Sequence, residues 1–179
     1  MKIRMMTVAG FAFLLASTVG AQTKFSGAVQ CAKPDPNYTI EVGDHPGHTY
    51  NLEKDSCKWT SATEINGLKL VDDNGVGTGE GWATKVTTMG SRVATMDNGD
   101  KLFISTKDSS PIKDNMPTDI EGTFSFTGGT GKLKGVKGHG TYKVTPAADG
   151  TASVTVEGEY TMPALMTPKP AASKPKLTK

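Results

Sequence analysis

Apolar residues in this chain recur at every second position, and this alternation restricts the fold more than any other feature of the sequence. In residues 152–160, Ala, Val, Val, Gly and Tyr alternate with Ser, Thr, Glu and Glu. The same period occurs in residues 25–31, 38–42, 50–53, 124–126 and 142–144. A period of two places one side-chain row of a β-strand against the core and the other in water. Each of these segments is therefore predicted to be a strand with one buried face.

Turn signals follow one another at short intervals, and helical periodicity is nearly absent. Clusters of Gly, Pro, Asn, Asp and Ser lie at 34–37, 43–47, 72–75, 97–100, 110–111, 115–117, 128–129 and 149–150. The pair Asn98-Gly99 is typical of a hairpin turn in which both residues have positive φ, and it is predicted to join residues 92–96 to 101–106. Many short strands without a crossover helix predict an all-β fold, a single antiparallel β-barrel of about eight or nine strands. Helix is expected only as a short turn near residues 61–66.

The two ends of the chain differ in composition from its middle. Residues 1–21 contain two basic residues, a short apolar run and a small-residue end at Val19-Gly20-Ala21, which together predict a secretory signal peptide. The apolar run is well below the roughly 20 residues that a membrane span needs, and no later run is longer. Residues 166–179 are rich in Lys and Pro and are predicted to be disordered. The sequence thus predicts an exported protein, periplasmic or extracellular, with one domain over residues 22–165.

The near-neutral total charge conceals an uneven distribution. The whole chain has 20 Lys and Arg against 18 Asp and Glu, a net charge of +2. Residues 22–165 hold 14 of the basic and all 18 of the acidic residues, so the predicted domain has a charge of 14 − 18 = −4. A nucleic-acid-binding face needs the opposite sign. The four lysines of residues 166–179 suit a solubilising end, with a weak contact to anionic envelope surfaces as the alternative.

Both cysteines of the chain, Cys31 and Cys57, lie in the predicted domain. Export would place them in an oxidising compartment, where disulfides persist. The alternative, a reactive or metal-binding pair of thiols, would need a closer Cys-x-x-Cys spacing or a nearby histidine cluster. We therefore predict a disulfide between them, which stabilises the fold by roughly 3–4 kcal/mol on a chain-entropy model.

The most distinctive segment, residues 121–142, has six glycines between positions 128 and 140. A phosphate-binding loop is excluded, because Phe126 and Leu133 stand where its first glycine and its Ser or Thr belong and no helix follows. Glycines in strands mark the bends and close approaches that a barrel needs. Leu133 is expected to face the interior, and the lysines on either side of it to face solvent.

The segment Phe126-Thr-Gly-Gly-Thr-Gly-Lys-Leu133, with the Gly-Val and Gly that follow it, is similar to the GGTGxF…G stretch of the allene oxide cyclase and dirigent proteins. That resemblance implies an eight-stranded antiparallel barrel of calycin-like shape with an apolar cavity. The cyclases rearrange an unsaturated fatty-acid epoxide, and the dirigent proteins steer phenoxy-radical coupling. None of their functional residues is matched to a position here. The chain also resembles small secreted bacterial proteins of unassigned function, through residues 30–34, Cys57-x-Trp59 and residues 157–160.

Histidines and carboxylates offer few candidates for chemistry. Asp44, His45 and His48 could begin a metal site, but zinc needs three or four well-placed ligands and the Pro-Gly turn around them favours a solvated loop. His139 is expected on the outward face of its strand. Two carboxylate pairs are interpreted as solvated charges: Asp72 with Asp73, and Glu157 with Glu159. We therefore expect no metal, no cofactor and no hydrolytic triad.

Aromatic residues are the strongest indication of function. Those expected to face the interior are Tyr50, Trp59, Trp82, Phe124, Phe126, Tyr142 and Tyr160. A small barrel is either filled by its own side chains or holds one small ligand. Filling is the simpler interpretation, and a pocket for a small apolar or aromatic molecule is the functional one.

Three functions remain open. A binding protein for such a molecule is favoured, because aromatic residues are predicted inside the barrel and no catalytic motif accompanies them. A cyclase or coupling enzyme, which the resemblance suggests, would need a charged or strongly polar side chain inside the barrel. The alternation leaves the facing of Arg92 and Glu121 ambiguous. An envelope structural or interaction domain without a ligand would act through its outer surface and residues 166–179.

Overall fold

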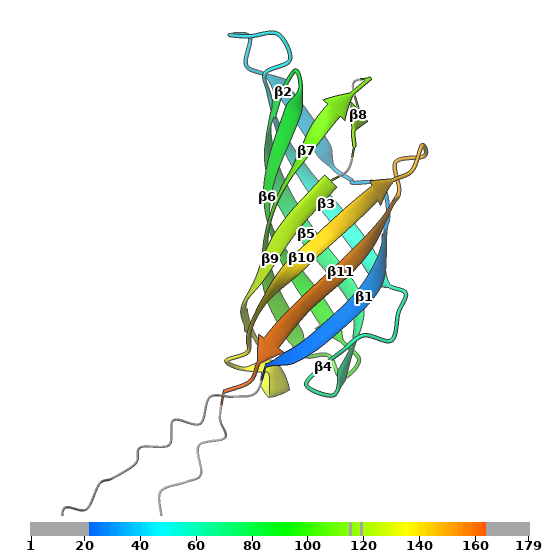
Figure 1. Cartoon of the computed structure of the whole chain (residues 1–179), viewed down its shortest axis with the longest axis vertical. Coiled ribbons are helices and arrows are strands. Elements are labelled where there is room, and N and C mark those ends of the chain that lie inside the picture. The colour runs from blue at the N-terminus through cyan, green and yellow to red at the C-terminus, as the bar shows by residue number, and fades with distance from the viewer. Residues whose placement is uncertain (1–21, 115, 119, 164–179) are drawn as a thin grey trace, which may run out of the picture.

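The computed structural model describes residues 22–114, 116–118 and 120–163, so the predicted signal peptide and the predicted Lys/Pro tail lie outside the described residues. The described chain forms an antiparallel barrel that eight strands close (Figure 1). In order around the barrel they are β1 (Thr23–Cys31), β3 (Thr49–Trp59), β5 (Leu68–Trp82), β6 (Lys85–Met96), β7 (Lys101–Lys113), β9 (Ile120–Gly129), β10 (Lys137–Pro146) and β11 (Ala152–Thr161). β1 pairs with both β3 and β11, which completes the cylinder. The predicted all-β barrel is confirmed.

Short elements extend the barrel at its two ends. Three two- to five-residue strands attach to longer ones: β2 (Asn37–Glu41) to β3, β4 (Glu64–Ile65) to β5, and β8 (Met116–Pro117) to β7. Within the described residues the only helical element is the 3₁₀ turn η1 (Gly131–Leu133). In Figure 1 the lower end of the barrel carries β4 and η1, and we call it the closed end. The upper end carries β2 and β8, and we call it the mouth.

The predicted helical turn at residues 61–66 is wrong. The Ser61 hydroxyl accepts a hydrogen bond of 2.8 Å from the backbone N–H of Ala28, and the Thr63 hydroxyl donates one of 3.0 Å to the carbonyl of Ser26. Both partners belong to β1, beside the part of it that does not pair with β3. The hydroxyls that could have capped a helix therefore hold this segment across the barrel wall.

The apolar core fills the closed end. Its buried members are Ile65, Leu68, Leu70, Ala94, Met96, Leu102, Ile104, Phe124, Phe126, Leu133, Val136 and Tyr160. Leu133 and Val136, from the glycine-rich segment, are fully buried, while Lys132 and Lys134 are exposed as predicted. The segment thus seals the lower opening of the barrel with two apolar side chains.

Three of the predicted turns lie within long strands instead, and one of them, residues 128–129, ends β9. Residues 72–75 belong to β5, and residues 110–111 belong to β7, where Pro111 pairs with the first residue of β6. A register shift between Leu70 and Asp72 changes which residues of β5 face inward. From Asp73 on, the inward positions of β5 are Asp73 and the four glycines 75, 77, 79 and 81. Glycine and aspartate, which predict turns when they cluster in a sequence, here form an inner strand face with small side chains.

The predicted hairpin at Asn98-Gly99 does join β6 to β7, but the turn differs from the expected type. Gly99 has a φ of +86°, whereas Asn98 is not among the described residues with positive φ. The connection is longer, with the N–H of Met96 donating to the carbonyl of Asp100 and that of Gly99 donating back to Met96. One residue of positive φ is enough in this loop.

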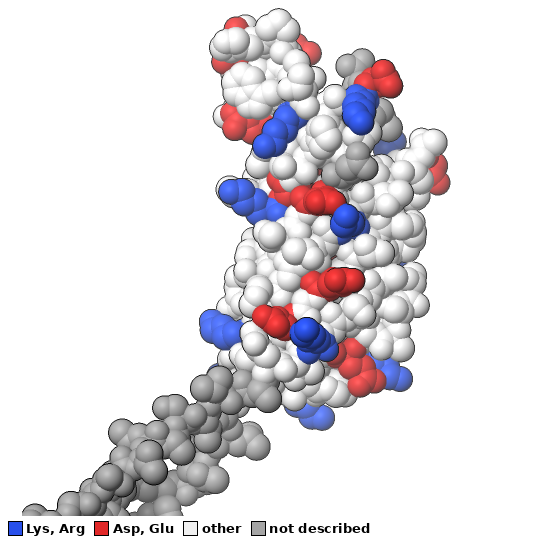
Figure 2. Space-filling view, viewed as in Figure 1, with Lys and Arg blue, Asp and Glu red and all other residues white. Residues whose placement is uncertain are grey.

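The outer surface of the barrel mixes charges of both signs. Figure 2 shows acidic and basic side chains interspersed over the strands on the face in view. His139 lies outward as predicted, 3.3 Å from Glu159, and Glu157 is likewise outward and exposed. Glu121 also faces out, where it pairs with Lys143 at 2.6 Å. In the part of the chain that the structure describes, no helix has the length and apolarity to cross a membrane.

Candidate functional site

The barrel is hollow between its core and its mouth. The hollow has a volume of about 320 Å³, and its lining reaches Pro34, Pro117 and Gly150 in the connections at the mouth. That volume is within the range of ligand-binding pockets, which run from roughly 300 to 1,000 Å³. The barrel is therefore filled in one part and open in the other.

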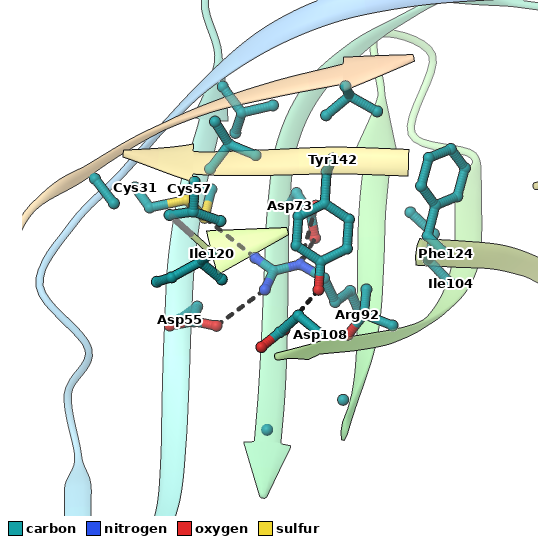
Figure 3. A pocket seen from close by; sticks show the side chains of 18 of the residues that line it. Cys31, Asp55, Cys57, Asp73, Arg92, Ile104, Asp108, Ile120, Phe124 and Tyr142 are labelled. Atoms are coloured by element: carbon teal, nitrogen blue, oxygen red, sulfur yellow. Dashed lines mark hydrogen bonds and ion pairs between the residues drawn. A yellow bond between two sulfur atoms is a disulfide. The ribbon is translucent and has the colours of Figure 1, made fainter. Parts of the chain in front are cut away.

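The cavity has two unlike walls. Strands β1, β9, β10 and β11 contribute the apolar one, lined by Phe25, Val29, Ile120, Phe124, Val144, Val154 and Val156. Strands β3, β5, β6 and β7 contribute the polar one, lined by Glu53, Asp55, Asp73, Thr88, Arg92, Thr106 and Asp108. Figure 3 shows Arg92 between Asp55 and Asp73, with Tyr142 and Asp108 beside them. A ligand inside would meet hydrocarbon on one side and ionisable groups on the other.

The small inner face of β5 makes room for this polar wall. A Cβ atom at Gly75 would lie 2.8 Å from Nη1 of Arg92, so the guanidinium crosses β5 directly over that glycine. On the opposite wall, a Cβ atom at Gly122 would collide with the ring of Tyr142. Glycine at these two positions allows the long polar side chains of neighbouring strands to lie flat across the interior.

Arg92 organises the polar wall. Its Nε donates to both carboxylate oxygens of Asp73 at 3.1 Å, and its Nη1 donates to Asp55 at 2.9 Å. Its Nη2 lies 3.1 Å from Sγ of Cys57. Burial disfavours the charged guanidinium, but the charges of Asp73 and Asp55 outweigh it and raise the pKa of Arg92. Burial raises the pKa of Asp73, and the Arg92 charge opposes that shift.

Asp108 and Tyr142 form a second polar pair inside the cavity. The Tyr142 hydroxyl donates to Oδ2 of Asp108 at 2.6 Å. Burial raises the pKa of Asp108, and the hydrogen bonds from Tyr142 and Thr88 counteract it. Burial and the neighbouring carboxylate raise the pKa of Tyr142, so the phenol keeps its proton. The pair holds a proton at a defined place in a partly dry site.

Glu53 is the remaining carboxylate of the wall. It faces inward from β3, and among the described residues no protein group donates a hydrogen bond to it. Burial, with the negative charges of Asp55 and Asp108, raises the pKa of Glu53 to about 6. A carboxyl group with this pKa changes charge just below neutral pH.

Four of the aromatic residues predicted to face inward do line the cavity: Trp59, Phe124, Phe126 and Tyr142. Tyr160 faces inward too, but it is packed in the core below, where its hydroxyl accepts a hydrogen bond from the N–H of Asn66. Tyr50 and Trp82 were placed wrongly. They are 51% and 41% exposed, because both lie at outward positions of β3 and β5. Whether the four lining aromatics bind a ligand stays a prediction.

The prediction of solvated charge is also wrong for Asp73. Its side chain is buried and ion-paired with Arg92, as the register shift in β5 turns it inward. Asp72 lies half-buried beside it, and its Oδ1 has no hydrogen-bond partner among the described residues. The ambiguous facing of Arg92 is now resolved: it points inward, whereas Glu121 points outward.

The predicted disulfide between Cys31 and Cys57 is present, and it lies in the cavity lining. The two residues are directly opposite in the register of β1 and β3. These strands share only three residue pairs, Val29–Trp59, Gln30–Lys58 and Cys31–Cys57. The disulfide thus covalently closes the shortest seam of the barrel.

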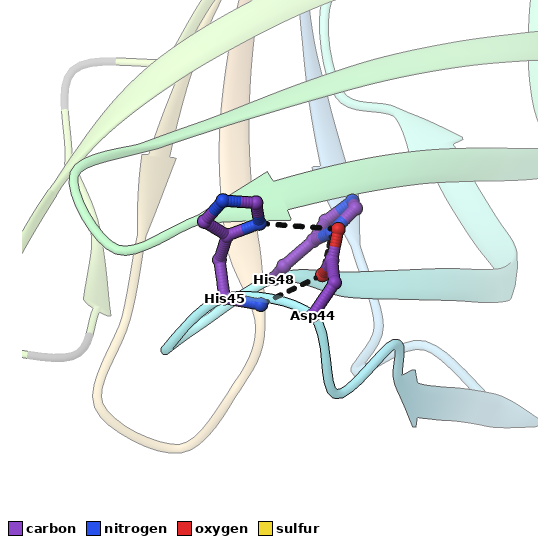
Figure 4. Close-up of side chains that lie close together, drawn as sticks. All are labelled: Asp44, His45 and His48. Carbon is purple, nitrogen blue, oxygen red and sulfur yellow. Dashed lines mark hydrogen bonds and ion pairs between the residues drawn. The ribbon is translucent and has the colours of Figure 1, made fainter.

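The cluster of Asp44, His45 and His48 lies outside the cavity, in the connection from β2 to β3 (Figure 4). His48 is buried, with Nδ1 at 2.6 Å from Asp44 and Nε2 at 3.2 Å from Glu80. Its ring stacks on Trp82 with centroids 3.9 Å apart. A ring with a carboxylate at each nitrogen is best satisfied as an imidazolium, which donates at both positions. The geometry is that of an ion-paired cation on an aromatic face.

This geometry predicts a raised pKa for His48, mainly through its hydrogen bond to Asp44. The stability that depends on it is present below about pH 6.5 and is lost as the pH rises through the raised folded value. An NMR titration of the imidazole protons should place the pKa above the ordinary value in the native protein. Replacing Asp44 by Asn should lower it, and replacing the distant Asp149 by Asn should not. An equal effect of both variants would contradict the assignment.

A second depression, of about 620 Å³, lies on the outer face of β5, β6, β7 and β9. Small hydroxyl residues form much of its lining, and among the described residues that line it Lys107 is the only one with an ionisable side chain. It therefore lacks the opposed apolar and charged walls of the interior, which remains the candidate site.

No known family model and no curated protein matches this sequence. Several solved structures are similar to it, among them the following two. A protein of unknown function from the DUF3224 family of Shewanella oneidensis MR-1 is 14% identical, with a TM-score of 0.49, over 80% of this chain and 100% of that one. A pterocarpan synthase dirigent protein is 13% identical, with a TM-score of 0.48, over 87% of this chain and 100% of that one.

Proposed function

We propose that the protein binds a small, mainly apolar or aromatic molecule in the cavity below the mouth. The observation that carries this proposal is a hollow of about 320 Å³ in a barrel whose other end is tightly packed. A core that only stabilises the fold is expected to be filled, because interiors of proteins are close-packed. Valines and phenylalanines line one wall of the hollow and would bury the apolar part of a ligand.

Export of the protein, periplasmic or extracellular, belongs to the same proposal. The disulfide at the cavity wall supports export, because disulfides persist in the oxidising compartments outside the cytoplasm. The ligand would then be one that the protein meets outside the cytoplasm. The test is to delete residues 1–21 and to measure how much protein leaves the cytoplasm. We expect export to be lost, and a variant that is still exported would refute this part of the proposal.

Binding can be measured through Trp59, which lines the cavity. The chain has two tryptophans, so Trp82→Phe leaves Trp59 as the single emitter. We expect neutral naphthylmethanol to change this emission by binding next to Trp59 inside the barrel. Val154→Phe, which adds an aromatic ring to the cavity, should weaken binding about tenfold or more, as a blocked pocket no longer accepts the ligand.

The matched control is Val93→Phe, because Val93 points outward from β6 and is 40% exposed. This variant should bind as the parent does. Circular dichroism of both variants checks that the barrel is intact. Equal binding by the Val154 and Val93 variants would mean that the probe sits outside the cavity, and the proposal would be withdrawn.

A second candidate function is catalysis inside the cavity, of the rearrangement or coupling type. It is favoured by one observation, the half-buried Asp108–Tyr142 pair with its proton beside Arg92. The substrates to test are a fatty-acid epoxide and, separately, a phenol with an added one-electron oxidant that generates its phenoxy radicals, with product chirality as the readout. Asp108→Asn should abolish any stereochemical bias that the protein imposes. Racemic product with the native protein would remove this candidate.

A further inference from the structure

The charges inside the cavity do not balance. The described residues that line it include four carboxylates and one guanidinium: Glu53, Asp55, Asp73, Asp108 and Arg92. With all of them ionised, the interior has a net charge of 1 − 4 = −3. Charges that are removed from water need opposite charges or protons nearby. The described residues supply only part of this compensation.

The ion pairs and hydrogen bonds show which of the four carboxylates are compensated. Arg92 pairs with Asp73 and Asp55, so one positive charge serves two carboxylates. Asp108 receives a neutral hydrogen bond from Tyr142. Glu53 receives none from the described residues, although it faces the same cavity. The missing positive charge therefore belongs near Glu53, Asp55 and Asp108, whose negative charges also act on one another.

The opposite wall determines what kind of cation fits. Ile120, Phe124, Val144 and Val154 present hydrocarbon to the cavity. A hydrated metal ion has no apolar part to bury against them. An organic ammonium group on an aromatic or aliphatic body matches both walls, because its charge meets the carboxylates while its body meets the hydrocarbon. Aromatic faces also attract ammonium groups.

We propose that the ligand of this cavity is a small organic amine, with its ammonium group at Glu53 and its apolar body against β9, β10 and β11. This inference rests on the proposed function and specifies the chemical class of the ligand. The field of the carboxylates also selects against anions, which would add to the uncompensated negative charge.

The test compares three probes of one shape: naphthylmethylamine, naphthylmethanol and naphthoate. Their binding is measured with the Trp82→Phe protein at about pH 7.5 by the change in Trp59 emission and by calorimetry. We expect the amine to bind at least about tenfold more tightly than the alcohol, and naphthoate to bind more weakly than either. Glu53→Gln should reduce the affinity for the amine about tenfold and leave that for the alcohol nearly unchanged.

The matched control is Glu121→Gln, which removes an outward carboxylate of similar charge. It should change none of the three affinities. A variant of Glu53 that no longer folds would be recognised by its circular dichroism, and the comparison of the three probes in the parent protein then still decides the question.

The pH dependence gives an independent readout. The groups that face the cavity with Glu53 are Asp55, Asp73, Asp108, Arg92 and Tyr142. Since the pKa of Glu53 is about 6, its protonation below neutral pH removes the charge that holds the amine. Affinity for the amine should fall by up to about tenfold between about pH 7.5 and pH 5, and this fall should be much smaller in Glu53→Gln.

The outcomes separate this inference from the proposal on which it rests. Equal affinity for amine and alcohol, with no effect of Glu53→Gln, would overturn the amine as ligand and leave an apolar binding site. Preference for naphthoate would overturn it as well. No binding of any of the three probes would instead remove the proposed binding function, and the amine with it.

Discussion

Replacing Arg92 by Met is expected to lower the free energy of unfolding at pH 7 by about 3–5 kcal/mol, which is typical when one partner of a buried ion pair is removed. Arg92 is the only cation among the described residues that line the cavity. Without it, Asp55 and Asp73 would keep their charges in a partly dry interior with no opposite charge at 2.9–3.1 Å. Urea unfolding of both proteins, followed by circular dichroism, gives the difference.

The control for Arg92→Met is Lys143→Met. Lys143 also pairs with a carboxylate, Glu121, but both side chains are exposed, at 71% and 62%. Exposed pairs contribute only about 0–1 kcal/mol, so this variant should be nearly as stable as the parent. The loss in Arg92→Met should also shrink as the pH falls and the Asp73 carboxyl, whose pKa burial raises, takes up a proton. Equal losses for the two variants would show that the Arg92 network is not a stabilising part of the interior.

Removing the disulfide should have an effect of similar size. Cys31→Ala with Cys57→Ala is expected to lower the free energy of unfolding by roughly 3–4 kcal/mol, because the bond restricts the unfolded chain between two residues 26 apart. The structure also indicates which strands should lose protection when the disulfide is removed. β1 and β3 share only three residue pairs, so in the double variant the amide of Ala32, which donates to the carbonyl of Ser56 in β3, should exchange with solvent faster than those of β6 and β7.

Reduction provides the control for this prediction. A thiol reductant should destabilise the native protein by about the same amount as the double variant, and it should have no effect on the double variant itself. Hydrogen exchange that increases uniformly over all eight strands would contradict a loss localised at the seam. No change in stability at all would mean that strand pairing alone holds β1 to β3.

Most of the barrel was predictable because alternation is a local property. Residues 25–31 and 152–160 have the predicted facing at every apolar position, and β1 and β11 pair along their whole length. The disulfide followed from the compartment that the first residues predict. These predictions needed no knowledge of which strands are neighbours.

The polar wall could not be predicted in the same way, since apolar residues alone were used to choose the inner face. Tyr50 and Trp59 are nine positions apart, so one uninterrupted strand cannot turn both inward. Fixing the facing of β3 from Cys57 and Trp59 would have placed Glu53 inside and Tyr50 outside. The odd or even spacing from Cys57 and Trp59 is therefore the sequence feature that indicates the facing of Glu53 and Tyr50.

The facing of Asp73 was beyond such reasoning. It depends on the register shift between Leu70 and Asp72, at the start of a segment whose composition predicts a turn and not a shifted strand. The aspartates and glycines of residues 72–81 resemble turn residues when read singly. In β5, Arg92 of the neighbouring strand lies across Gly75 and pairs with Asp73, and side chains of β3 such as Asn51 and Thr49 lie over the later glycines. Pairwise contacts between strands, rather than local preference, decide this part of the structure.

The pairing of β1 with β11 has a kinetic consequence. Thr23 pairs with Tyr160 and Cys31 with Ala152, so the first and last strands of the barrel meet across nearly the whole described chain. Contacts so distant in sequence carry a large loop-closure entropy and form slowly. Until β11 is available, β1 and β10 would both present unpaired edges, which invite association between chains. Folding is therefore expected to finish only after the last strand has emerged, and the hollow interior exists only from that moment.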